Sequence, residues 1–436
     1  MSKFIINGGK KLSGSIAINS SKNAAVALLL GSLVNRGVTI LKNVPQIEEV
    51  NRLLEVLKSI GVKIERSKRN IKITPPQRFN FTKLDREAAK KTRSIIMAIG
   101  ALSGRVKSFA LPQAGGCRLG SRTVKPHLFA LENFGIKIET NKNSYIVKSG
   151  QLKPAEFALY ETGDTVTENA LLAAAQIKGK TIIRMASANY MVQDVCFYLE
   201  KLGVKIKGIG TSTLEIEGRG VLNKNVEYTI SEDPIDAMLF LSAAIVTNSS
   251  ITIKRCPIEF LELELLKLEK MGFKYQILKR YKSYNKMTKL IDIKTGIFQL
   301  KALEEKIHAM PFPGINQDNL PFFVPIATQV RGETFIHDWT YENRAVYFTE
   351  LNKLGAEINL IDNHRVTVKG PTKLKANEVI CPPALRPAAI ILVAMLGAKG
   401  KSVLHNVYPI HRGYEKLEER LKKLGAEIEL VEESNA

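Results

Sequence analysis

The sequence predicts an α/β protein built from six copies of one structural unit. A leucine-rich amphipathic stretch that ends in glycine and continues into alternating residues recurs six times along the 436 residues. Each copy is typical of an amphipathic helix that ends at its glycine and is followed by a strand. With 45% hydrophobic residues, the chain is also too long for one ordinary core and should form two or three domains. The copies are LKSIGVKIE (57–65), LENFGIKIE (131–139), LEKLGVKIK (199–207), LEKMGFKYQ (268–276), LNKLGAEIN (351–359) and LKKLGAEIE (421–429).

A second repeated element lies upstream of each copy. It consists of a nearly all-apolar helix, a break at glycine or asparagine, and a β-branched strand, as in NAAVALLLGSLVNRGVTIL (23–41). A helix that is apolar all round must be surrounded by protein, so these helices should form the centres of the domains. Each unit therefore reads as apolar helix, strand, loop, amphipathic helix, strand and a second strand. The longest spacing between copies contains KRYKSYNKMTK (279–289), which we expect to be an enlarged, solvated hairpin.

Composition limits the classes of partner. The 64 basic and 42 acidic residues give a net charge of +22, but the lysines are dispersed and no aromatic-interleaved basic stripe appears, so we expect no nucleic-acid partner. No apolar run reaches the length of a membrane span and the start lacks a signal-peptide block, so we expect a cytosolic protein without a membrane partner. Neither the cysteines nor the six histidines have metal-site spacing, so free thiols and no metal are expected. The four cysteines are Cys117, Cys196, Cys256 and Cys381.

Charged residues recur at one position of the repeat, the start of the apolar helix. Acidic residues there suit the positive end of a helix, and capping alone would explain Asp233 and Asp318. Capping does not explain cations at the same position, which are favourable mainly if an anion lies between them and the backbone N–H groups. We therefore expect these helix starts to face a shared anion-binding cleft, together with loop residues 12 or 13 positions after the breaks, Cys117, Arg344 and Arg412. The helix-start residues are Lys22, Arg93, Asp164, Asp233, Asp318 and Arg386.

The segment LPQAGGCRLGSRTVKPH (111–127) contains one thiol, Cys117, among glycines and cations. Gly115 and Gly116 allow the backbone to approach a ligand closely, and the cationic side chains give the segment an affinity for anions. A reactive thiol suits this setting. The alternative is that Cys117 is a small buried packing residue in an ordinary turn. The residues alone leave both interpretations open.

Five segments carry a more specific signal: SSKNAA (20–25), KTRSIIMAIGAL (91–102), GGCRLGSR (115–122), ENR (342–344) and HRGYEKLEERLKKLGAEIE (411–429). Over essentially the whole chain, they resemble the UDP-N-acetylglucosamine enolpyruvyl transferases. The resemblance implies two inside-out α/β barrel domains, each of three repeated βαβαββ-type units around buried helices. Residues 22–231 would form the domain that carries the Cys117 loop. Residues 1–21 plus 232–436 would form the second domain, which carries Asp318, Arg386 and Arg412.

The resemblance also implies a reaction. The enolpyruvyl group of phosphoenolpyruvate would pass to the 3'-hydroxyl of UDP-N-acetylglucosamine with release of phosphate, the first committed step of peptidoglycan synthesis, and hence of cell-wall biogenesis, cell shape and division. Phosphoenolpyruvate is a substrate, and no cofactor is implied. Cys117 would protonate the methylene carbon and can carry a covalent adduct, Asp318 would be the base, and Lys22 and Arg412 would surround the donor. The implied substrate-binding residues are Asn23, Arg93, Arg122, Thr123, Val124, Lys125, Pro126, Gly163, Thr340 and Arg386.

Several residues depart from the family pattern. Lys125 stands where an aspartate is common, Pro126 replaces an aliphatic residue, and Ala384 replaces an aspartate two residues before Arg386. The segment PFPGINQD (311–318) is longer than usual. These departures leave the donor half intact and alter the acceptor half. A paralogous transferase with a different uridine-nucleotide acceptor, or a non-catalytic or RNA-associated relative of the fold, are therefore the alternative hypotheses.

Overall fold

The structure, a computed structural model, describes residues 2–113, 115, 123–296 and 299–432. These residues form two compact units of mixed α/β structure. Unit 1 comprises residues 2–19 and 232–432, and unit 2 comprises the described part of residues 20–231. None of the described helices is long and apolar enough to cross a membrane. Two predicted site residues, Cys117 and Arg122, lie outside the described residues.

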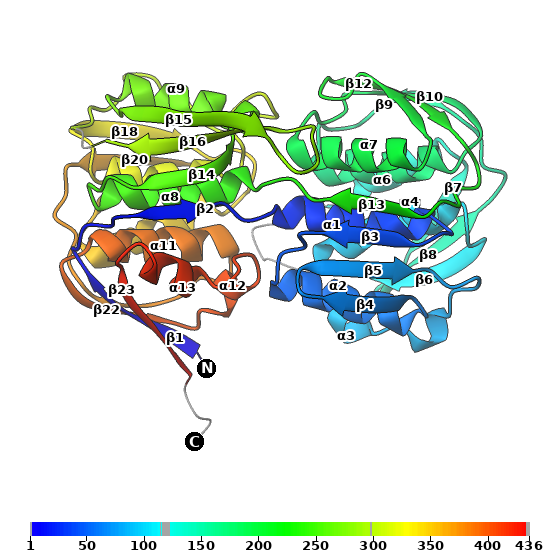
Figure 1. The fold of residues 1–436 in the computed structure, drawn as a ribbon, viewed down its shortest axis with the longest axis horizontal. Helices are drawn as coiled ribbons and strands as arrows, with labels where there is room; N and C mark the ends of the chain where they lie inside the picture. Colours follow the sequence, from blue (N-terminus) through cyan, green and yellow to red (C-terminus); the bar gives the residue numbers. More distant parts are fainter. Residues whose placement is uncertain (1, 114, 116–122, 297–298, 433–436) are drawn as a thin grey trace. The chain divides into compact units, whose positions relative to one another are not determined.

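Unit 2 has three sheets, with strand orders β13-β3-β5-β4, β6-β8-β7 and β11-β12-β10-β9. Figure 1 shows the first of these sheets in blue and green, with β13 beside β3. The strands are β3 (Thr39–Lys42), β4 (Lys63–Ser67), β5 (Asn70–Thr74), β6 (Ser108–Pro112), β7 (Ile136–Thr140), β8 (Ser144–Ser149), β9 (Glu156–Ala158), β10 (Gly179–Arg184), β11 (Lys205–Lys207), β12 (Thr213–Gly218) and β13 (Val226–Thr229).

The helices of unit 2 follow the predicted alternation of apolar and amphipathic segments. Helices α1, α4 and α6 contact one another, and nearly all of their residues are buried. The helices are α1 (Lys22–Gly31), α2 (Glu48–Ser59), α3 (Arg86–Lys90), α4 (Ala98–Ser103), α5 (Lys125–Glu132), α6 (Asp164–Ala175) and α7 (Tyr190–Lys201), with 3₁₀ helices η1 (Ser32–Val34), η2 (Phe81–Lys83) and η3 (Arg93–Met97).

Unit 1 also has three sheets, with orders β21-β22-β1-β23, β15-β16-β14-β2 and β17-β18-β20-β19. In the first of them the N-terminal strand β1 pairs antiparallel with both β22 and β23. The strands are β1 (Ser2–Gly8), β2 (Ser15–Ala17), β14 (Thr252–Pro257), β15 (Tyr275–Lys282), β16 (Lys289–Thr295), β17 (Ile307–His308), β18 (Gly332–His337), β19 (Glu357–Asp362), β20 (Arg365–Gly370), β21 (Glu378–Ile380), β22 (Gly400–His405) and β23 (Glu427–Glu432).

The core of unit 1 is formed by three apolar helices, α8, α10 and α11, which contact one another. Every residue of α8 is buried, as expected for a helix that is apolar all round. The helices are α8 (Pro234–Val246), α9 (Glu262–Lys270), α10 (Phe323–Ala327), α11 (Leu385–Gly397), α12 (Tyr408–His411) and α13 (Leu417–Lys422), with 3₁₀ helices η4 (Ile258–Phe260), η5 (Leu320–Phe322) and η6 (Ala345–Leu354).

The repeat predicted from the sequence is confirmed in the backbone. In five of the six sheets, the strand after an apolar helix pairs parallel with one neighbour and antiparallel with the other. The last unit has no second strand of its own, and β1 occupies that position. The six repeat glycines all adopt left-handed backbone angles, with φ between 83° and 103°, which other residues rarely adopt. They are Gly61, Gly135, Gly203, Gly272, Gly355 and Gly425.

Two further expectations have clear outcomes. The segment from Lys279 to Lys289 belongs to an antiparallel hairpin of β15 and β16, as predicted, with Lys282 opposite Lys289. We expected two α/β barrel domains, but the described strands do not form a closed barrel. Within the described ranges the strands form six separate sheets, and several edge strands, such as the two-residue β17, are too short to join one sheet to the next. The fold is therefore a mixed α/β arrangement of open sheets and buried helices.

Candidate active site

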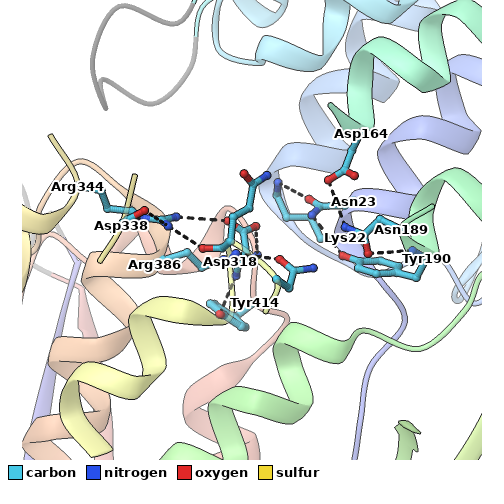
Figure 2. A network of polar contacts seen from close by, with 12 residues as sticks. Lys22, Asn23, Asp164, Asn189, Tyr190, Asp318, Asp338, Arg344, Arg386 and Tyr414 are labelled. Atoms are coloured by element: carbon cyan, nitrogen blue, oxygen red, sulfur yellow. Dashed lines mark hydrogen bonds and ion pairs between the residues drawn. The ribbon is translucent and has the colours of Figure 1, made fainter. Parts of the chain in front are cut away.

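In unit 1, the carboxylate of Asp318 lies between two buried arginines. Its side chain is 19% exposed, and its Oδ2 accepts a hydrogen bond from Nη2 of Arg386 at 3.0 Å. Its Oδ1 lies 3.7 Å from Nη1 of Arg344. Figure 2 shows the three side chains pointing toward one another. The two nearby cations favour the ionised form of Asp318. The carboxylate is also partly accessible to solvent.

Arg386 is the second residue of α11 and is itself almost fully buried. Its Nη1 donates a hydrogen bond to the hydroxyl of Tyr414 at 2.7 Å. Burial lowers the pKa of Arg386, but Tyr414, Asp318 and Asp233 outweigh burial and raise the pKa above its usual value. Burial raises the pKa of Tyr414, and the neighbouring Arg386 opposes that rise. Arg386 is therefore a permanent cation at the start of an apolar helix, as predicted.

Capping explains one of the acidic helix-start residues and not the other. Asp233 is the N-cap of α8, and its carboxylate accepts a hydrogen bond from the backbone N–H of Ile235 at 2.8 Å. Asp318 instead lies in a turn before η5, and the N-cap of that 3₁₀ helix is Asn319, which makes no side-chain cap bond. The capping interpretation is thus confirmed for Asp233 and wrong for Asp318.

Arg344 is fully buried and forms a two-bond pair with Asp338, a residue that directly follows β18. Its Nη2 donates to Oδ1 of Asp338 at 2.9 Å and to the backbone carbonyl of Gln317 at 2.6 Å. The guanidinium lies 4.1 Å from the ring centre of Tyr341. Burial lowers the pKa of Arg344, but Asp338 restores it to above its usual value, so the side chain is charged.

The turn around Asp318 is also fixed from helix α9. Glu264 is buried there, and its Oε1 accepts hydrogen bonds from the backbone of Asn316 at 3.0 Å and from the side chain of Asn319 at 2.8 Å. Burial raises the pKa of Glu264. The backbone N–H of Asp318 donates to Oδ1 of Asn316 at 2.8 Å. The long segment 311–318 therefore ends in an anchored turn.

In unit 2, two predicted residues lie together at the start of α1. Ser21 caps this helix by accepting from the backbone N–H of Ala24 at 3.1 Å. Nζ of Lys22 donates to Oδ1 of Asn23 at 3.4 Å, and Nδ2 of Asn23 donates to the hydroxyl of Tyr190 at 3.3 Å. Figure 2 shows this chain from the lysine to the tyrosine at the start of α7. The lysine charge is thus placed at a helix N-terminus, where an anion would bind.

The start of α6 in unit 2 carries a second polar group. Gly163 is the N-cap of this helix, and Asp164 is its first residue. The Asp164 carboxylate accepts from Oγ of Ser187 at 2.6 Å and from Nδ2 of Asn189 at 3.3 Å. One turn later, Glu168 is buried and its Oε1 has no hydrogen-bond partner. Burial, followed by the nearby Asp164 and Asp194, raises the pKa of Glu168 well above its usual value.

The structure brings Arg93 and the segment 123–126 together. Nη2 of Arg93 donates to the backbone carbonyl of Thr123 at 3.1 Å. The Thr123 hydroxyl accepts from the backbone N–H of Lys125, the first residue of α5, at 3.2 Å. Val124 is the N-cap of α5, and Pro126 lies in its first turn, where a missing N–H costs nothing. The unusual proline is therefore compatible with the local backbone.

Two further predicted residues belong to unit 1. Thr340 is half-buried in the loop that follows β18, and Arg412 is half-buried at the C-terminal end of α12. Ala384, the N-cap of α11, makes no side-chain cap bond and packs with Tyr341 and Tyr347 instead. The helix start is thus left without the carboxylate that the family pattern implies.

The three cysteines in the described residues are free and buried. Burial raises the pKa of all three thiols, and that of Cys381 reaches about 12, so none is activated as a thiolate. Among the described histidines, cysteines and acids, no cluster is arranged to hold a metal ion. The sequence did not identify Glu264, Asp338 or Tyr414 as site residues, and it singled out Arg344 by its position in the repeat and within the ENR segment (342–344) without assigning it a role.

Comparisons with known proteins agree with this fold. The family model for EPSP synthase (3-phosphoshikimate 1-carboxyvinyltransferase) matches residues 6–421. A UDP-N-acetylglucosamine 1-carboxyvinyltransferase of Wolinella succinogenes is 36% identical over 97% of this chain and 98% of its own length. The protein of the same name from Treponema denticola is 33% identical over 99% of this chain and all of its own.

Solved structures extend the likeness to the fold. The enolpyruvyl transferase NikO from Streptomyces tendae matches with a TM-score of 0.85 and 22% identity, covering 99% of both chains. An EPSP synthase from Acinetobacter baumannii matches with a TM-score of 0.75 and 18% identity over 99% of this chain and 100% of its own. The repeated units, the full-length match to the family model and the relatives above 30% identity together show that this chain belongs to the UDP-N-acetylglucosamine 1-carboxyvinyltransferase family of enolpyruvyl transferases.

Proposed function

We propose that the protein transfers the enolpyruvyl group of phosphoenolpyruvate to the 3'-hydroxyl of UDP-N-acetylglucosamine and releases phosphate. The observation that carries this proposal is the partly exposed carboxylate of Asp318 between two buried arginines. A base must be ionised and reachable, and a reaction at a triply charged donor requires fixed cations. The names of relatives that match along the full chain support the same acceptor.

In the addition step, Asp318 accepts the proton of the acceptor's 3'-hydroxyl group. The oxygen of that hydroxyl forms a bond to C2 of phosphoenolpyruvate. Cys117 supplies a proton to the methylene carbon, C3, so that the tetrahedral intermediate is saturated. In the elimination step, C3 returns a proton to the Cys117 thiolate while the bond between C2 and the phosphate oxygen breaks with its electron pair leaving on the phosphate. The proton held by Asp318 then passes to the released phosphate. Lys22, Arg386 and Arg412, with Arg122, would stabilise the donor phosphate and the negative charge that develops.

The acceptor would be held mainly by residues of unit 2. The contact between Arg93 and Thr123 supports this role, because it places a guanidinium directly beside the segment proposed to hold uridine. Arg93 would bind the diphosphate, and Thr123, Val124, Lys125 and Pro126 the uridine. Asn23, Gly163 and Thr340 would complete the sugar-nucleotide contacts.

Each unit would be an inside-out domain of three repeated units around its buried helices. Fixed cations serve the charge of the donor, so we propose that no metal or other cofactor is required. The reaction would be the first committed step of peptidoglycan synthesis in the cytoplasm, supporting cell-wall formation during growth and division.

The direct test measures phosphate release from phosphoenolpyruvate with UDP-N-acetylglucosamine, and mass spectrometry identifies the product. We expect release only when both substrates are present, with a product heavier by one enolpyruvyl group. If another uridine nucleotide supports release and UDP-N-acetylglucosamine does not, the acceptor is different, as the departures at Lys125, Pro126 and Ala384 would permit. Tight RNA binding without phosphate release would instead support a non-catalytic role.

The role of Cys117 has its own test. Fosfomycin, an epoxide that alkylates the cysteine of this family, should inactivate the protein by forming a covalent adduct at Cys117. The three buried cysteines provide an internal control, because their raised pKa values disfavour the nucleophilic thiolate. Peptide mass spectrometry that found the label on Cys196, Cys256 or Cys381 would contradict the assignment.

A further inference from the structure

A buried arginine that belongs to no proposed substrate contact reaches the turn that carries Asp318. We propose that Arg344, held in place by Asp338, is a positioning residue that sets both the location and the charge of the Asp318 carboxylate. This inference rests on the proposed function, since it assigns Arg344 a role in the action of the proposed base. It concerns residues of unit 1 only, all of which are described by the structure.

The donors of Arg344 are distributed in a way that suits this role. Its Nε and Nη2 bind the carboxylate of Asp338, and Nη2 also binds the backbone carbonyl of Gln317 at 2.6 Å. The remaining terminal nitrogen, Nη1, is buried and has no hydrogen-bond partner. The closest acid to it is Asp318, at 3.7 Å. A shift of about 0.8 Å would bring this pair to the length of a charge-assisted hydrogen bond.

Arg344 therefore acts on the Asp318 turn at two adjacent residues. Its bond to Gln317 fixes the backbone immediately before Asp318, and its free N–H faces the carboxylate itself. Tyr341 covers the guanidinium plane at 4.1 Å, which limits rotation of the fork. A planar fork held on three sides can orient a carboxylate, whereas the single rotating charge of a lysine cannot.

A second buried pair in unit 1 shows what a purely structural arginine looks like. Arg420 binds both oxygens of Asp236, at 2.8 and 2.7 Å, and its guanidinium lies over the ring of Phe240. Its remaining bond is to the backbone carbonyl of Ala17. This pair ties the N-terminal segment to α8 and α13, and no buried nitrogen of Arg420 lacks a hydrogen-bond partner. The two pairs have the same chemistry, so Arg420 and Asp236 provide a matched control.

The charge of Arg344 should have a measurable effect on the base. A cation within about 4 to 6 Å favours the ionised carboxylate, so Asp318 should titrate at lower pH with Arg344 present than without it. Arg386 also favours the ionised form of Asp318, whereas the nearby acids disfavour it. Asp318 faces Arg344 and Arg386. The other charged or titratable groups that act on these two arginines are Asp338, Tyr341, Tyr414 and Asp233, whereas Asp236 acts on Tyr414.

The test replaces both members of the pair by neutral side chains of similar shape, Arg344→Gln with Asp338→Asn, so that no charge is left buried alone. We expect the acid limb of the kcat pH profile to move upward, because the Arg344 cation faces Asp318 directly; the shift is smaller than loss of Arg344 alone would give, since loss of the Asp338 charge acts in the opposite direction. We also expect kcat to fall roughly 10- to 100-fold because the carboxylate is less well oriented, while KM for both substrates changes less than about twofold. The single variant Arg344→Lys keeps the charge and loses the fork, so kcat should fall with the acid limb unmoved.

The matched control is Arg420→Gln with Asp236→Asn, which should lower the melting temperature and leave the acid limb in place. An unmoved acid limb in the Arg344→Gln, Asp338→Asn protein would overturn the inference. A large rise in KM for phosphoenolpyruvate at unchanged kcat would also overturn it, because Arg344 would then bind the donor. Wild-type turnover is measured first in the same assay. Its absence would count against the proposed function, whereas normal wild-type turnover with an unaffected variant counts against the role of Arg344 alone.

Discussion

The two units share one arrangement of sheets and helices, yet they accommodate their buried acids differently. In unit 1 two buried acids are paired with arginines, Asp338 with Arg344 and Asp236 with Arg420, whereas Glu264 accepts bonds from neutral groups. In unit 2 the comparable acids accept bonds from neutral groups. Asp164 binds Ser187 and Asn189, and Asp194 binds Tyr228 and Ser231.

This difference shows that the repeat determines the backbone and the apolar core but not the charge chemistry. A carboxylate beside a guanidinium stays ionised when buried, whereas one without such a partner is protonated more readily. Asp318 has two guanidinium neighbours, and Glu168 in unit 2 is buried with an unpartnered oxygen and a raised pKa. The predictions below challenge this contrast at individual residues of the two units.

The largest effect is expected at Asp318. Asp318→Asn keeps the size of the side chain and removes the base, so kcat should fall by about 10²- to 10⁴-fold, the usual contribution of general base catalysis. Steady-state kinetics should show much smaller changes in KM. Asp362→Asn, at an exposed acid of the same unit that pairs with Arg365, is the control and should leave kcat unchanged. Equal losses in kcat and in acceptor binding would mean that Asp318 only binds substrate.

Much of the fold could be predicted from the sequence because apolar residues and glycines recur at the same positions of each repeat. The left-handed Gly203 and Gly425 end their helices where the pattern indicated. The apolar helix of the fifth repeat was harder to predict. Its apolar stretch forms the short η5, which contains Pro321, and the short α10, which contains Pro325, because each proline removes a helix hydrogen bond. The position of β1 in the last sheet depends on a contact between the two ends of the chain, which no local pattern reveals.

The candidate site was predictable only where charge broke a local rule. Lys22 and Arg386 stand out because cations at helix starts oppose the helix dipole. Asp318 suits a helix start, so its sequence position also fitted simple capping, and only its contacts with two arginines separate the interpretations. Glu264 gives no signal at all, because an acid in the first turn of an amphipathic helix is ordinary until its burial is known.

The same substitution in each unit tests whether the acids differ as the contacts indicate. Asp236→Asn leaves the buried Arg420 without its ionic partner, and should lower the free energy of unfolding by about 3 kcal/mol. Asp194→Asn weakens an acceptor for the hydroxyls of Tyr228 and Ser231 and for the backbone N–H of Ser231, and should cost about 1 kcal/mol. Urea denaturation of both variants measures the difference. Equal losses would show that arginine pairing does not distinguish the two units.

The smallest effect is expected at Glu168, where it should depend on pH. The pKa of Glu168 is raised in the folded protein by burial and then by Asp164 and Asp194, so this residue stabilises the fold fully only below its unfolded pKa, about 4.3. That contribution is lost as the pH rises toward the folded pKa. Glu168→Gln removes the titration, so the stability of the variant relative to wild type should rise as the pH increases from about 5 to 8. Chemical denaturation at several pH values measures the stability difference between variant and wild type. If that difference stays constant with pH, Glu168 is ionised in the folded protein, as expected for Asp338 and Asp236 beside their arginines.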